Sequence, residues 1–268
     1  LAAMNRLPVD MIEVGYRSLP SKNYMGRFGY SPRFELERLR ERTQKQVAVM
    51  LNEKDIRVGN LVSVLDPVAD LVDMVRLAIA PDNMARAIEL GRAIKERGIA
   101  VAFNVMYMSK WHEMTAFLEL LPQLDGWVDC INMVDSFGGV TPDDVRRTFA
   151  MVRERTSVPI GFHGHNNLEL ALINTLTAIE CGAEWVDATV LGMGRGAGNL
   201  KLELLLAYLN KGGLEVDFNV LGEVVSRFSE LHSKYGWGAS LPYMLSGANS
   251  LPQKEVMAWV SNRLLSLN

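Results

Sequence analysis

The stretch P-I-G-F-H-G-H at residues 159–165, together with the helical pattern at residues 168–181 that follows it, decides the fold class. The first part is a short apolar run of the kind that forms a buried strand. The second part is closed by Gly182, a residue type common just past helix ends. Because side chains alternate along a strand, His163 and His165 should point to the same side, close to the carboxyl end of that strand. The stretch therefore predicts a β/α unit that carries two imidazoles at its strand end.

The same alternation recurs along the whole chain. Strands are predicted at residues 11–15, 47–51, 72–79, 100–105, 128–134, 159–165 and 185–191. Helices are predicted from Ser31-Pro32 to residue 43, over 82–97, after Lys110, from Thr141-Pro142 onward, over 168–181 and over 200–210. Strands that alternate with helices indicate a parallel sheet. No strand–GxGxxG–helix unit lies near the start, and polar residues follow successive strands, so a (β/α)8 TIM barrel is favoured over an open doubly wound sheet.

A closed barrel requires an eighth strand, and only seven are predicted. Residues 1–10 have the pattern of a helix tail and its exit turn, so we expect the first strand and most of its helix to lie upstream of this sequence. Residues 1–213 are interpreted as the barrel catalytic domain. Residues 214–268, with a long helical pattern and a Gly/Pro-rich stretch, are interpreted as a C-terminal helical extension packed on the barrel.

The composition excludes several classes of protein. The chain has 268 residues, 49% hydrophobic and 22% charged, with a formal net charge of −3, and no cluster of Lys and Arg suggests nucleic-acid binding. No apolar run approaches the ~18 residues of a membrane span. Cys130 and Cys181 lie in patterns typical of buried positions, which favours a reducing compartment. We therefore expect a cytoplasmic protein with neither nucleic acid nor membrane as a partner.

The two imidazoles are the strongest chemical signal. His163 and His165 are two of only four histidines, and an i, i+2 pair at a strand end favours divalent-metal binding over a hydrogen-bonded core pair. A metal site needs a further ligand, and a carboxylate from the expected upstream strand would fit. Asn166 or Asn167 has a second interpretation as a helix N-cap.

The glycine-rich stretch 192–199 follows the last predicted strand. Gly194 and Gly196 would let the backbone approach a substrate closely, next to a helix N-terminus. Asn199 could contact the metal, or it could cap the helix that starts at residue 200; both interpretations stay open.

Other polar residues also lie at predicted strand ends. Glu13, Arg76 and Asp135 are the candidate catalytic residues. Arg76 lies in an apolar strand, so it must point into the barrel or pair with an acid. Arg17 could instead lie on the surface of a long loop. The candidate substrate-binding residues are Arg17, Asn104, Tyr107, Ser136, Gly194 and Gly196.

These motifs together resemble the metal-dependent aldolase and lyase barrels typified by 4-hydroxy-2-oxovalerate aldolase and hydroxymethylglutaryl-CoA lyase. The resemblance rests on four motifs between Ile12 and Asn199: I-E-V-G at 12–15, D-S-F-G at 135–138, H-G-H-N at 163–166 and the loop that ends G-N at 198–199. It implies that His163, His165 and Asn199 form the metal site, with Mn²⁺ or Mg²⁺ as cofactor. The family's L-R-D-G motif on the first strand, which supplies an Asp ligand, does not occur in this sequence.

The implied reaction is cleavage or formation of a 4-hydroxy-2-oxo acid through a metal-bound pyruvate-type enolate, which makes the expected enzyme a lyase. One alternative is an acetyl-CoA-dependent Claisen synthase of the isopropylmalate or homocitrate type, but such loops usually carry a glutamate that stretch 194–199 lacks. A carboxyltransferase barrel would carry an M-K-D tripeptide, which is absent, and an inactive ligand-binding barrel is the last alternative. An aldehyde dehydrogenase partner would accord with the family. Trp237 and Tyr243 are compatible with a homo-oligomer and equally with a core-covering role.

Overall fold

The computed structural model describes residues 1–22 and 25–262 and has the alternating α/β order that the sequence predicts. The strands are β1 (Met11–Tyr16), β2 (Gln46–Asn52), β3 (Met74–Ile79), β4 (Ala100–Val105), β5 (Cys130–Asp135), β6 (Ile160–Gly164) and β7 (Trp185–Val186). The helices are α1 (Ala2–Asn5), α2 (Arg33–Arg40), α3 (Leu61–Val64), α4 (Met84–Lys95), α5 (Thr115–Leu118), α6 (Pro142–Arg153), α7 (Ala171–Glu180), α8 (Leu202–Lys211), α9 (Phe218–Tyr235), α10 (Leu241–Ala248) and α11 (Gln253–Ser261). The seven strands form one sheet in chain order.

The chain divides into two compact units. The first unit comprises Leu1–Met106, Glu113–Asn132 and Val152–Pro159, and it contains strands β1 to β4. The second unit comprises Tyr107–His112, Met133–Met151 and the described chain from Ile160 onward, and it contains β6, β7 and the C-terminal helices. Strand β5 contributes its first half to one unit and its second half to the other.

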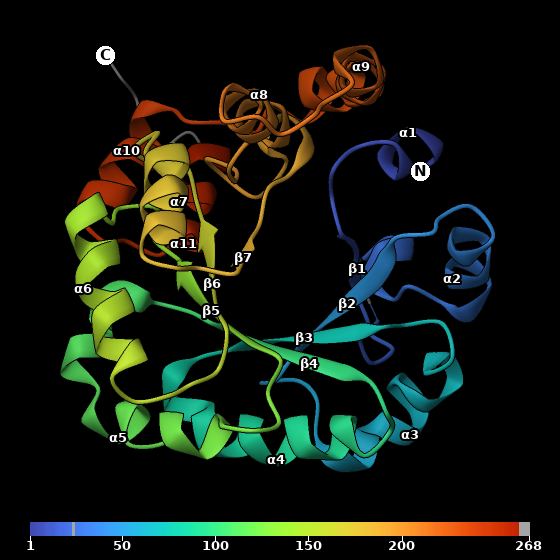
Figure 1. The fold of residues 1–268 in the computed structure, drawn as a ribbon, viewed down its shortest axis with the longest axis vertical. Coiled ribbons are helices and arrows are strands. Elements are labelled where there is room, and N and C mark those ends of the chain that lie inside the picture. Colours follow the sequence, from blue (N-terminus) through green and yellow to red (C-terminus); the bar gives the residue numbers. More distant parts are fainter. Residues whose placement is uncertain (23–24, 263–268) are drawn as a thin grey trace. The chain divides into compact units, whose positions relative to one another are not determined.

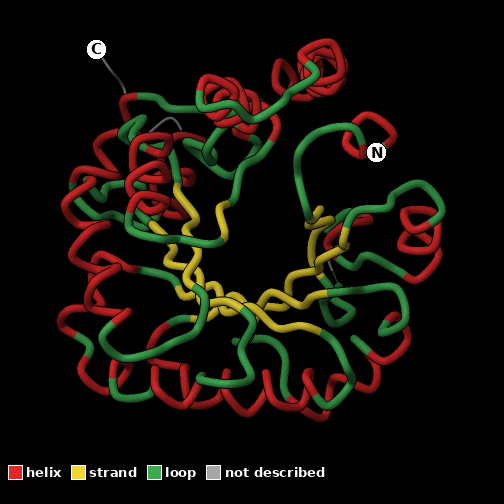
Figure 2. Tube along the Cα trace, viewed as in Figure 1, coloured by secondary structure: helices red, strands yellow, loops and turns green. Residues whose placement is uncertain are grey.

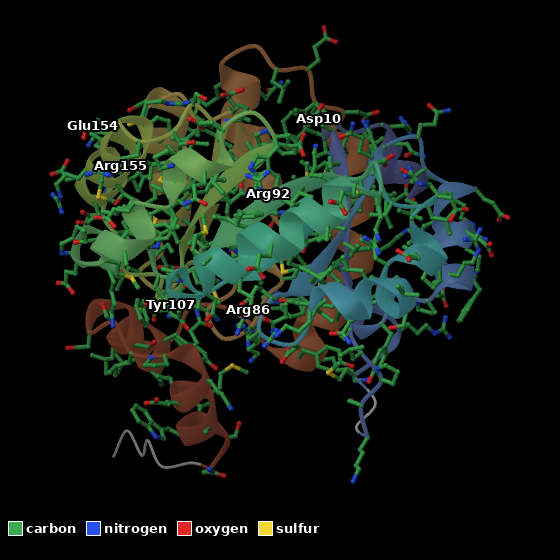
Figure 3. All side chains as sticks on the ribbon, turned by 90° about the horizontal axis from the view of Figure 1, so that it is seen from below. Asp10, Arg86, Arg92, Tyr107, Glu154 and Arg155 are labelled. Carbon is green, nitrogen blue, oxygen red and sulfur yellow. The ribbon has the colours of Figure 1, made fainter. Side chains whose placement is uncertain are left out.

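The first unit is a parallel sheet covered by helices. Strands β1 to β4 pair in parallel with their neighbours, and α4 runs along β3 and β4 (Figure 1). In Figure 2 the helices of this unit, in red, flank its yellow strands. Helix α4 can approach the sheet because residue 91 is glycine: a Cβ there would lie 2.9 Å from the ring of Phe103 on β4. Arg92 lies on the outer face of α4, where Figure 3 labels it. Its guanidinium stacks over the ring of Trp127 at 4.8 Å.

The second unit contains the histidine strand. Strand β6 pairs in parallel with β7, and α7 packs on β6, where residue 164 is glycine and Ala171 lies beside it. Leu205 of helix α8 belongs to a small buried apolar cluster that also contains Ala171 of α7. Helix α6 begins with a reciprocal cap, since the Asp144 carboxylate accepts a hydrogen bond from the Thr141 amide at 2.8 Å. The predicted start of α6 at Thr141-Pro142 is thereby confirmed.

Several predicted boundaries were wrong for local reasons. Strand β7 ends at Val186 rather than at residue 191, because residues 190–192 form a 3₁₀ turn in which Leu191 has φ +54°. Ser31 does not cap α2: its own φ is +39°, and Pro32 occupies the N-cap position without a side-chain cap. Between β2 and β3 the short helix α3 was not predicted. The segment at Lys110 is a 3₁₀ helix, Met108–Glu113, followed by the short α5.

Two further expectations concern cysteines and membranes. Cys130 is buried and Cys181 is partly buried, and neither forms a disulfide within the described residues. Within residues 1–22 and 25–262, no helix combines the length and apolar character needed to cross a bilayer.

Candidate metal site and strand-end residues

The two imidazoles of β6 lie side by side. The ring centroids of His163 and His165 are 5.1 Å apart, with the ring planes at 79° to each other. This is the arrangement expected from the alternation of side chains along a strand, because His163 and His165 are two residues apart and therefore face the same side. The convergence of the two rings, on which the metal hypothesis depends, is therefore present in the fold.

His163 is oriented by a carboxylate on the next strand. Its Nδ1 lies 2.8 Å from Oδ2 of Asp187, and both side chains are about a fifth exposed. The register of β6 on β7 pairs Phe162 with Val186, so His163 and Asp187 occupy the next position of each strand. A carboxylate on Nδ1 fixes the proton there and leaves Nε2 free to bind a metal. Asp187 was not predicted as a site residue; the available signal was an acidic residue inside the apolar stretch 185–191 that was predicted to be a strand.

His165 is oriented by a backbone carbonyl. Its Nδ1 lies 2.7 Å from the carbonyl oxygen of Asp135, which can only accept, so Nδ1 carries the proton. Burial, with a smaller contribution from the neighbouring His163, lowers the pKa of His165 to about 3. The imidazole is therefore neutral at physiological pH, with the Nε2 lone pair available, which is the form that binds metals.

Asn199 lies directly beside this strand, bridged to His165 through the backbone. Its Nδ2 donates to the carbonyl of Met193 at 2.9 Å, and its Oδ1 is buried without a hydrogen-bond partner in the described chain. Asn199 does not cap α8, because that helix begins at Leu202 and its N-cap is Lys201. The capping interpretation is thus wrong, and an orphaned acceptor is left beside the histidine strand.

These donors fit a divalent cation. Two imidazoles and an amide oxygen are ligand types that Mn²⁺, Zn²⁺ and related ions accept. Among residues 1–22 and 25–262, no group of three or more His, Cys, Asp or Glu side chains could hold a metal. The candidate ligands in the described chain are His163, His165 and Asn199.

Asp135 supports the loop after β5. The residue is only 1% exposed, and its two carboxylate oxygens accept hydrogen bonds from the amides of Gly139 and Val140 at 3.2 and 3.3 Å. Burial raises its pKa to about 6, although those amides oppose the shift. Asp135 thus shapes the loop with its side chain while its carbonyl orients His165.

Ser136 and Tyr107 connect two further loops. The Ser136 hydroxyl accepts a hydrogen bond from the Tyr107 amide at 2.9 Å, and the Tyr107 ring lies 5.4 Å from that of Phe137. Tyr107 itself has φ +61°, a conformation that a non-glycine residue adopts only when its surroundings hold it there. Figure 3 labels its position.

The glycine-rich loop is folded on itself. The Asn199 amide donates to the carbonyl of Gly192 at 3.0 Å. A Cβ on Gly194 would lie 2.7 Å from Nδ2 of Asn199, and one on Gly196 would lie 2.7 Å from Oε1 of Gln253. Gly196 has φ +61°, a conformation that favours glycine independently of any ligand. At Gly194 the nearest atom is the end of the Asn199 side chain, which can move.

The first unit contains a buried polar group inside its sheet, not at the predicted strand ends, because Arg76 and Glu13 are each the third residue of a six-residue strand. Arg76 on β3, 8% exposed, donates to Glu13 on β1 at 3.0 Å and to Oδ1 of Asn104 on β4 at 3.2 Å. Asn104 also accepts a hydrogen bond from Asn132 at 3.0 Å. The expectation that Arg76 would pair with an acid is confirmed.

Backbone carbonyls accept the hydrogen bonds of the Arg17 side chain. Its guanidinium donates to the backbone carbonyls of Val64, at 2.7 Å from Nε, and of Tyr30, at 2.9 Å from Nη1. Burial lowers the pKa of Arg17. These contacts fasten two loops of the first unit together, which differs from the exposed position considered as the alternative.

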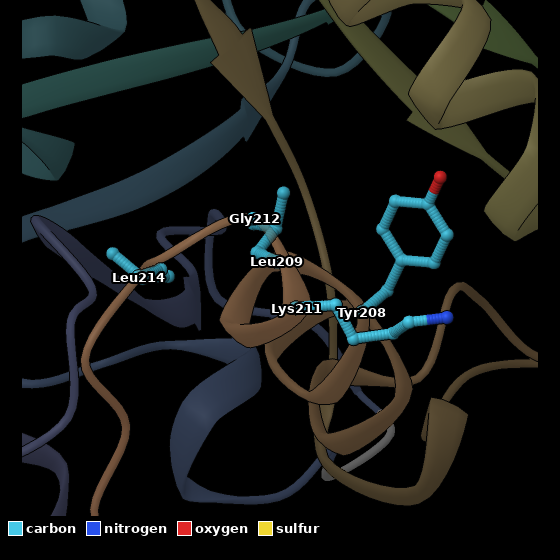
Figure 4. Close-up of a pocket in the computed structure, with 5 residues that line it drawn as sticks. All are labelled: Tyr208, Leu209, Lys211, Gly212 and Leu214. Atoms are coloured by element: carbon cyan, nitrogen blue, oxygen red, sulfur yellow. The ribbon is translucent and has the colours of Figure 1, made fainter.

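An open apolar hollow lies apart from these residues. It has a volume of about 560 Å³ and lies at the end of α8 (Figure 4). Its lining residues are Tyr208, Leu209, Lys211, Gly212 and Leu214. None of the candidate catalytic, substrate-binding or metal residues lines it, so we do not assign the chemistry to this hollow.

Comparisons with known proteins agree with this architecture. A 4-hydroxy-2-oxovalerate aldolase from Thermomicrobium roseum is 46% identical over 127 residues, which are 47% of this chain and 35% of that protein. One from Chloroflexus aggregans is 32% identical over 225 residues, which are 82% of this chain and 64% of that protein. The chain thus spans between about a third and two thirds of the length of these curated relatives.

Solved structures extend the likeness to the fold. The N-terminal domain of a proposed aldolase from Bacteroides vulgatus matches with a TM-score of 0.95 and 58% identity, covering 97% of this chain and 87% of that one. The carboxyl transferase domain of Rhizobium etli pyruvate carboxylase matches with a TM-score of 0.71 at 17% identity, covering 87% of this chain and 43% of that one, which is a likeness of fold alone. The HMGL-like family model matches residues 2–226. The chain therefore belongs to the HMGL-like family.

Proposed function

We propose that the protein to which this chain belongs is a divalent-metal-dependent aldolase that cleaves or forms 4-hydroxy-2-oxo acids. The observation that carries the proposal is the pair of imidazoles on β6, each with its Nδ1 engaged and its Nε2 left for a cation. Relatives named 4-hydroxy-2-oxovalerate aldolase support the reaction class. The complete architecture is proposed to be a (β/α)8 barrel over residues 1–213 and an upstream first strand, with residues 214–268 as a helical extension.

The cation is proposed to be Mn²⁺ or Mg²⁺. It would be held by His163, His165 and Asn199, and when bound it would polarise the oxygens of a 2-oxo acid. The side chains of Asp187 and the carbonyl of Asp135 keep the two imidazoles in the correct tautomer. In the cleavage direction the proton of the 4-hydroxyl is removed, the C3–C4 bond breaks, and its electron pair is taken up by the 2-oxo group as an enolate.

The other candidates are assigned supporting roles. Asp135, Ser136 and Tyr107 are proposed to hold the loops beside the histidine strand rather than to exchange protons. In the first unit, Arg76 and Glu13 are proposed as catalytic residues, because a guanidinium can hold a carboxylate or a developing enolate. Asn104 would keep Arg76 in place through the 3.2 Å hydrogen bond. For Arg17 we propose a structural role, since backbone carbonyls engage its donors.

An acetyl-CoA-dependent Claisen synthase is the alternative. Its glycine-rich loop would be expected to carry a glutamate, whereas residues 194–199 read G-R-G-A-G-N. The lyase names of the relatives, which include an oxaloacetate decarboxylase from Mycobacterium tuberculosis that is 30% identical over 152 residues, also favour the aldolase.

The test uses the full-length protein with a panel of 4-hydroxy-2-oxo acids and oxaloacetate, and it measures pyruvate release with Mn²⁺ and with chelator. We expect metal-dependent cleavage of at least one 4-hydroxy-2-oxo acid, abolished in His163→Ala and His165→Ala. His112→Ala is the matched control, because that imidazole is exposed in the 3₁₀ helix Met108–Glu113, outside the histidine pair. Cleavage that survives chelation and both alanine variants would refute the proposal, and acetyl-CoA consumption with a 2-oxo acid would favour the synthase.

A further inference from the structure

Residues 237–253, which follow the part of the chain matched by the family model, contact the loops that carry the metal-site residues. The match ends at residue 226, within α9, so the family assignment says nothing of this segment. The segment includes α10 and the start of α11 and belongs to the same compact unit as β6 and β7. Its contacts therefore need a separate explanation.

Asn167 is the first point of contact. It lies two residues after His165 and is 0% exposed. Its Nδ2 donates to the carbonyl of Tyr243 on α10 at 3.0 Å, and its Oδ1 accepts from Nε2 of Gln253 on α11 at 3.0 Å. Both polar atoms of a fully buried side chain are thus bonded to the C-terminal segment, so Asn167 does not serve as a cap for α7.

Gln253 connects this point to the second loop. While its Nε2 bonds to Asn167, its Oε1 lies so close to Gly196 that a Cβ on that glycine would be 2.7 Å away. Gly196 lies in the same loop as Asn199, the candidate third donor. One amide side chain therefore touches both the loop after β6 and the loop after β7.

Further contacts fix the segment in the same place. The Trp237 indole donates to the carbonyl of Leu191 at 2.9 Å, and the Gly238 amide donates to the carbonyl of Gly196 at 3.0 Å. On the other side, the backbone of Gly139 packs against the carbonyl of Gly247, where a Cβ would lie 2.2 Å from that oxygen. The loop of Gly139 is the one that Asp135 shapes and that orients His165.

We infer that residues 237–253 act as a positioning element for the metal site, with Asn167 and Gln253 as its positioning residues. This inference rests on the proposed function for the metal itself. The end of β6 holds two imidazoles and the loop after β7 holds an amide oxygen. These three donors must lie within tenths of an ångström of a cation's preferred distances, and loops are the most mobile parts of a fold. The segment hydrogen-bonds to the loops after β6 and β7 and packs against the loop after β5. It therefore links the three loops, which lowers the entropy that metal binding must overcome.

The test compares three variants of the full-length protein with the wild type. Gln253→Ala removes the bridge, and Asn167→Asp keeps the volume of the side chain but replaces the donor to the Tyr243 carbonyl with an acceptor. Asn249→Ala is the matched control: that exposed amide lies in the same segment, but it donates only to the carbonyl of Leu245 at the end of α10. Mn²⁺ affinity is measured by titration on chelator-treated protein, and amide hydrogen exchange is measured on the metal-free protein.

We expect the Kd for Mn²⁺ to rise ~10-fold or more in Gln253→Ala and Asn167→Asp, and by less than about twofold in Asn249→Ala. In the metal-free protein, amide exchange should accelerate in residues 192–199 of the two positioning variants without a comparable change in β1 to β4. Unchanged Mn²⁺ affinity and unchanged exchange in Gln253→Ala would overturn the inference, even if Asn167→Asp failed to fold. If the wild type bound no Mn²⁺, the proposed function would fail, and the exchange measurement would still decide whether the segment orders these loops.

Discussion

Replacement of Asp187 measures how much the orientation of His163 contributes to metal binding. The carboxylate accepts a hydrogen bond from Nδ1 of His163 at 2.8 Å in a partly buried setting. A hydrogen bond to a charged acceptor contributes ~1.5–3 kcal/mol net and one to a neutral acceptor ~0.5–1.5 kcal/mol. Asp187→Asn keeps an acceptor but removes the charge, so it should cost about 1 kcal/mol of binding free energy, or ~5-fold in Mn²⁺ affinity. Asp187→Ala removes the acceptor as well and should cost ~10–100-fold.

The assay is a calorimetric Mn²⁺ titration of chelator-treated protein at neutral pH. Glu184→Gln is the control, since it removes an exposed carboxylate just before β7 and reports the effect of net charge alone. The reasoning predicts a graded loss of affinity, with alanine worse than asparagine and the control near wild type. Wild-type affinity in Asp187→Ala, or an equal loss in Glu184→Gln, would refute it.

The metal-free protein should show two opposing pH effects and one steric effect. The pKa of His165 is lowered to about 3 in the folded protein, so its contribution to the free energy of unfolding is fully present above pH ~6.5. That contribution falls by about 2 kcal/mol between pH 6.5 and pH 5, because the unfolded chain binds a proton that the folded one does not. In urea unfolding, His165→Gln should lose this dependence on pH. The pKa of Asp135 is raised to about 6, so its contribution to the free energy of unfolding is present below pH ~4. Up to about 3 kcal/mol of it is lost as the pH rises through 6. An Asp135→Asn variant whose unfolding free energy kept this dependence on pH would contradict the assignment. Gly138→Ala should destabilise the protein by more than ~2 kcal/mol, because φ is +66° and a Cβ would lie 2.2 Å from Oδ1 of Asn167. Gly126→Ala is the control: φ is +80° there, but no described atom lies within 4 Å of the added Cβ, so only ~1 kcal/mol of backbone strain is expected. Similar unfolding free energies for the two alanine variants would show that the close approach at residue 138 is unimportant.

The positions of the strands could be predicted because each strand is a nearly continuous apolar run. Strand β4 was predicted with its observed bounds, and five of the others within two residues at either end. The prediction of β7 failed because the apolar pattern of residues 188–191 continues past the strand, while Leu191 adopts φ +54° under the hydrogen bonds of the following loop. Helix α3 was missed because a single turn stabilised by packing has no long periodic pattern.

The contacts of the site were harder to predict than its residues. Asp187 could have been found from the register of β6 on β7, but that register is set by pairing between strands rather than by either sequence alone. Arg17 and Arg76 were both predicted at strand ends, yet Arg17 bonds to backbone carbonyls and Arg76, inside β3, to a carboxylate and an amide. Only the neighbours that the fold supplies distinguish the two.

The amino-acid sequence by itself determined the alternation of strands and helices and the convergence of His163 and His165, because both follow from periods of the local backbone. Tertiary structure alone decided which atoms surround them: Asp187 and the Asp135 carbonyl on the two Nδ1 atoms, an Asn199 oxygen with no partner among the described residues, and an Asn167 bonded to α10 and α11. These partners lie up to 86 residues apart in the chain. Local propensity carries no information over such separations, since the contacts form only when packed elements bring the loops together.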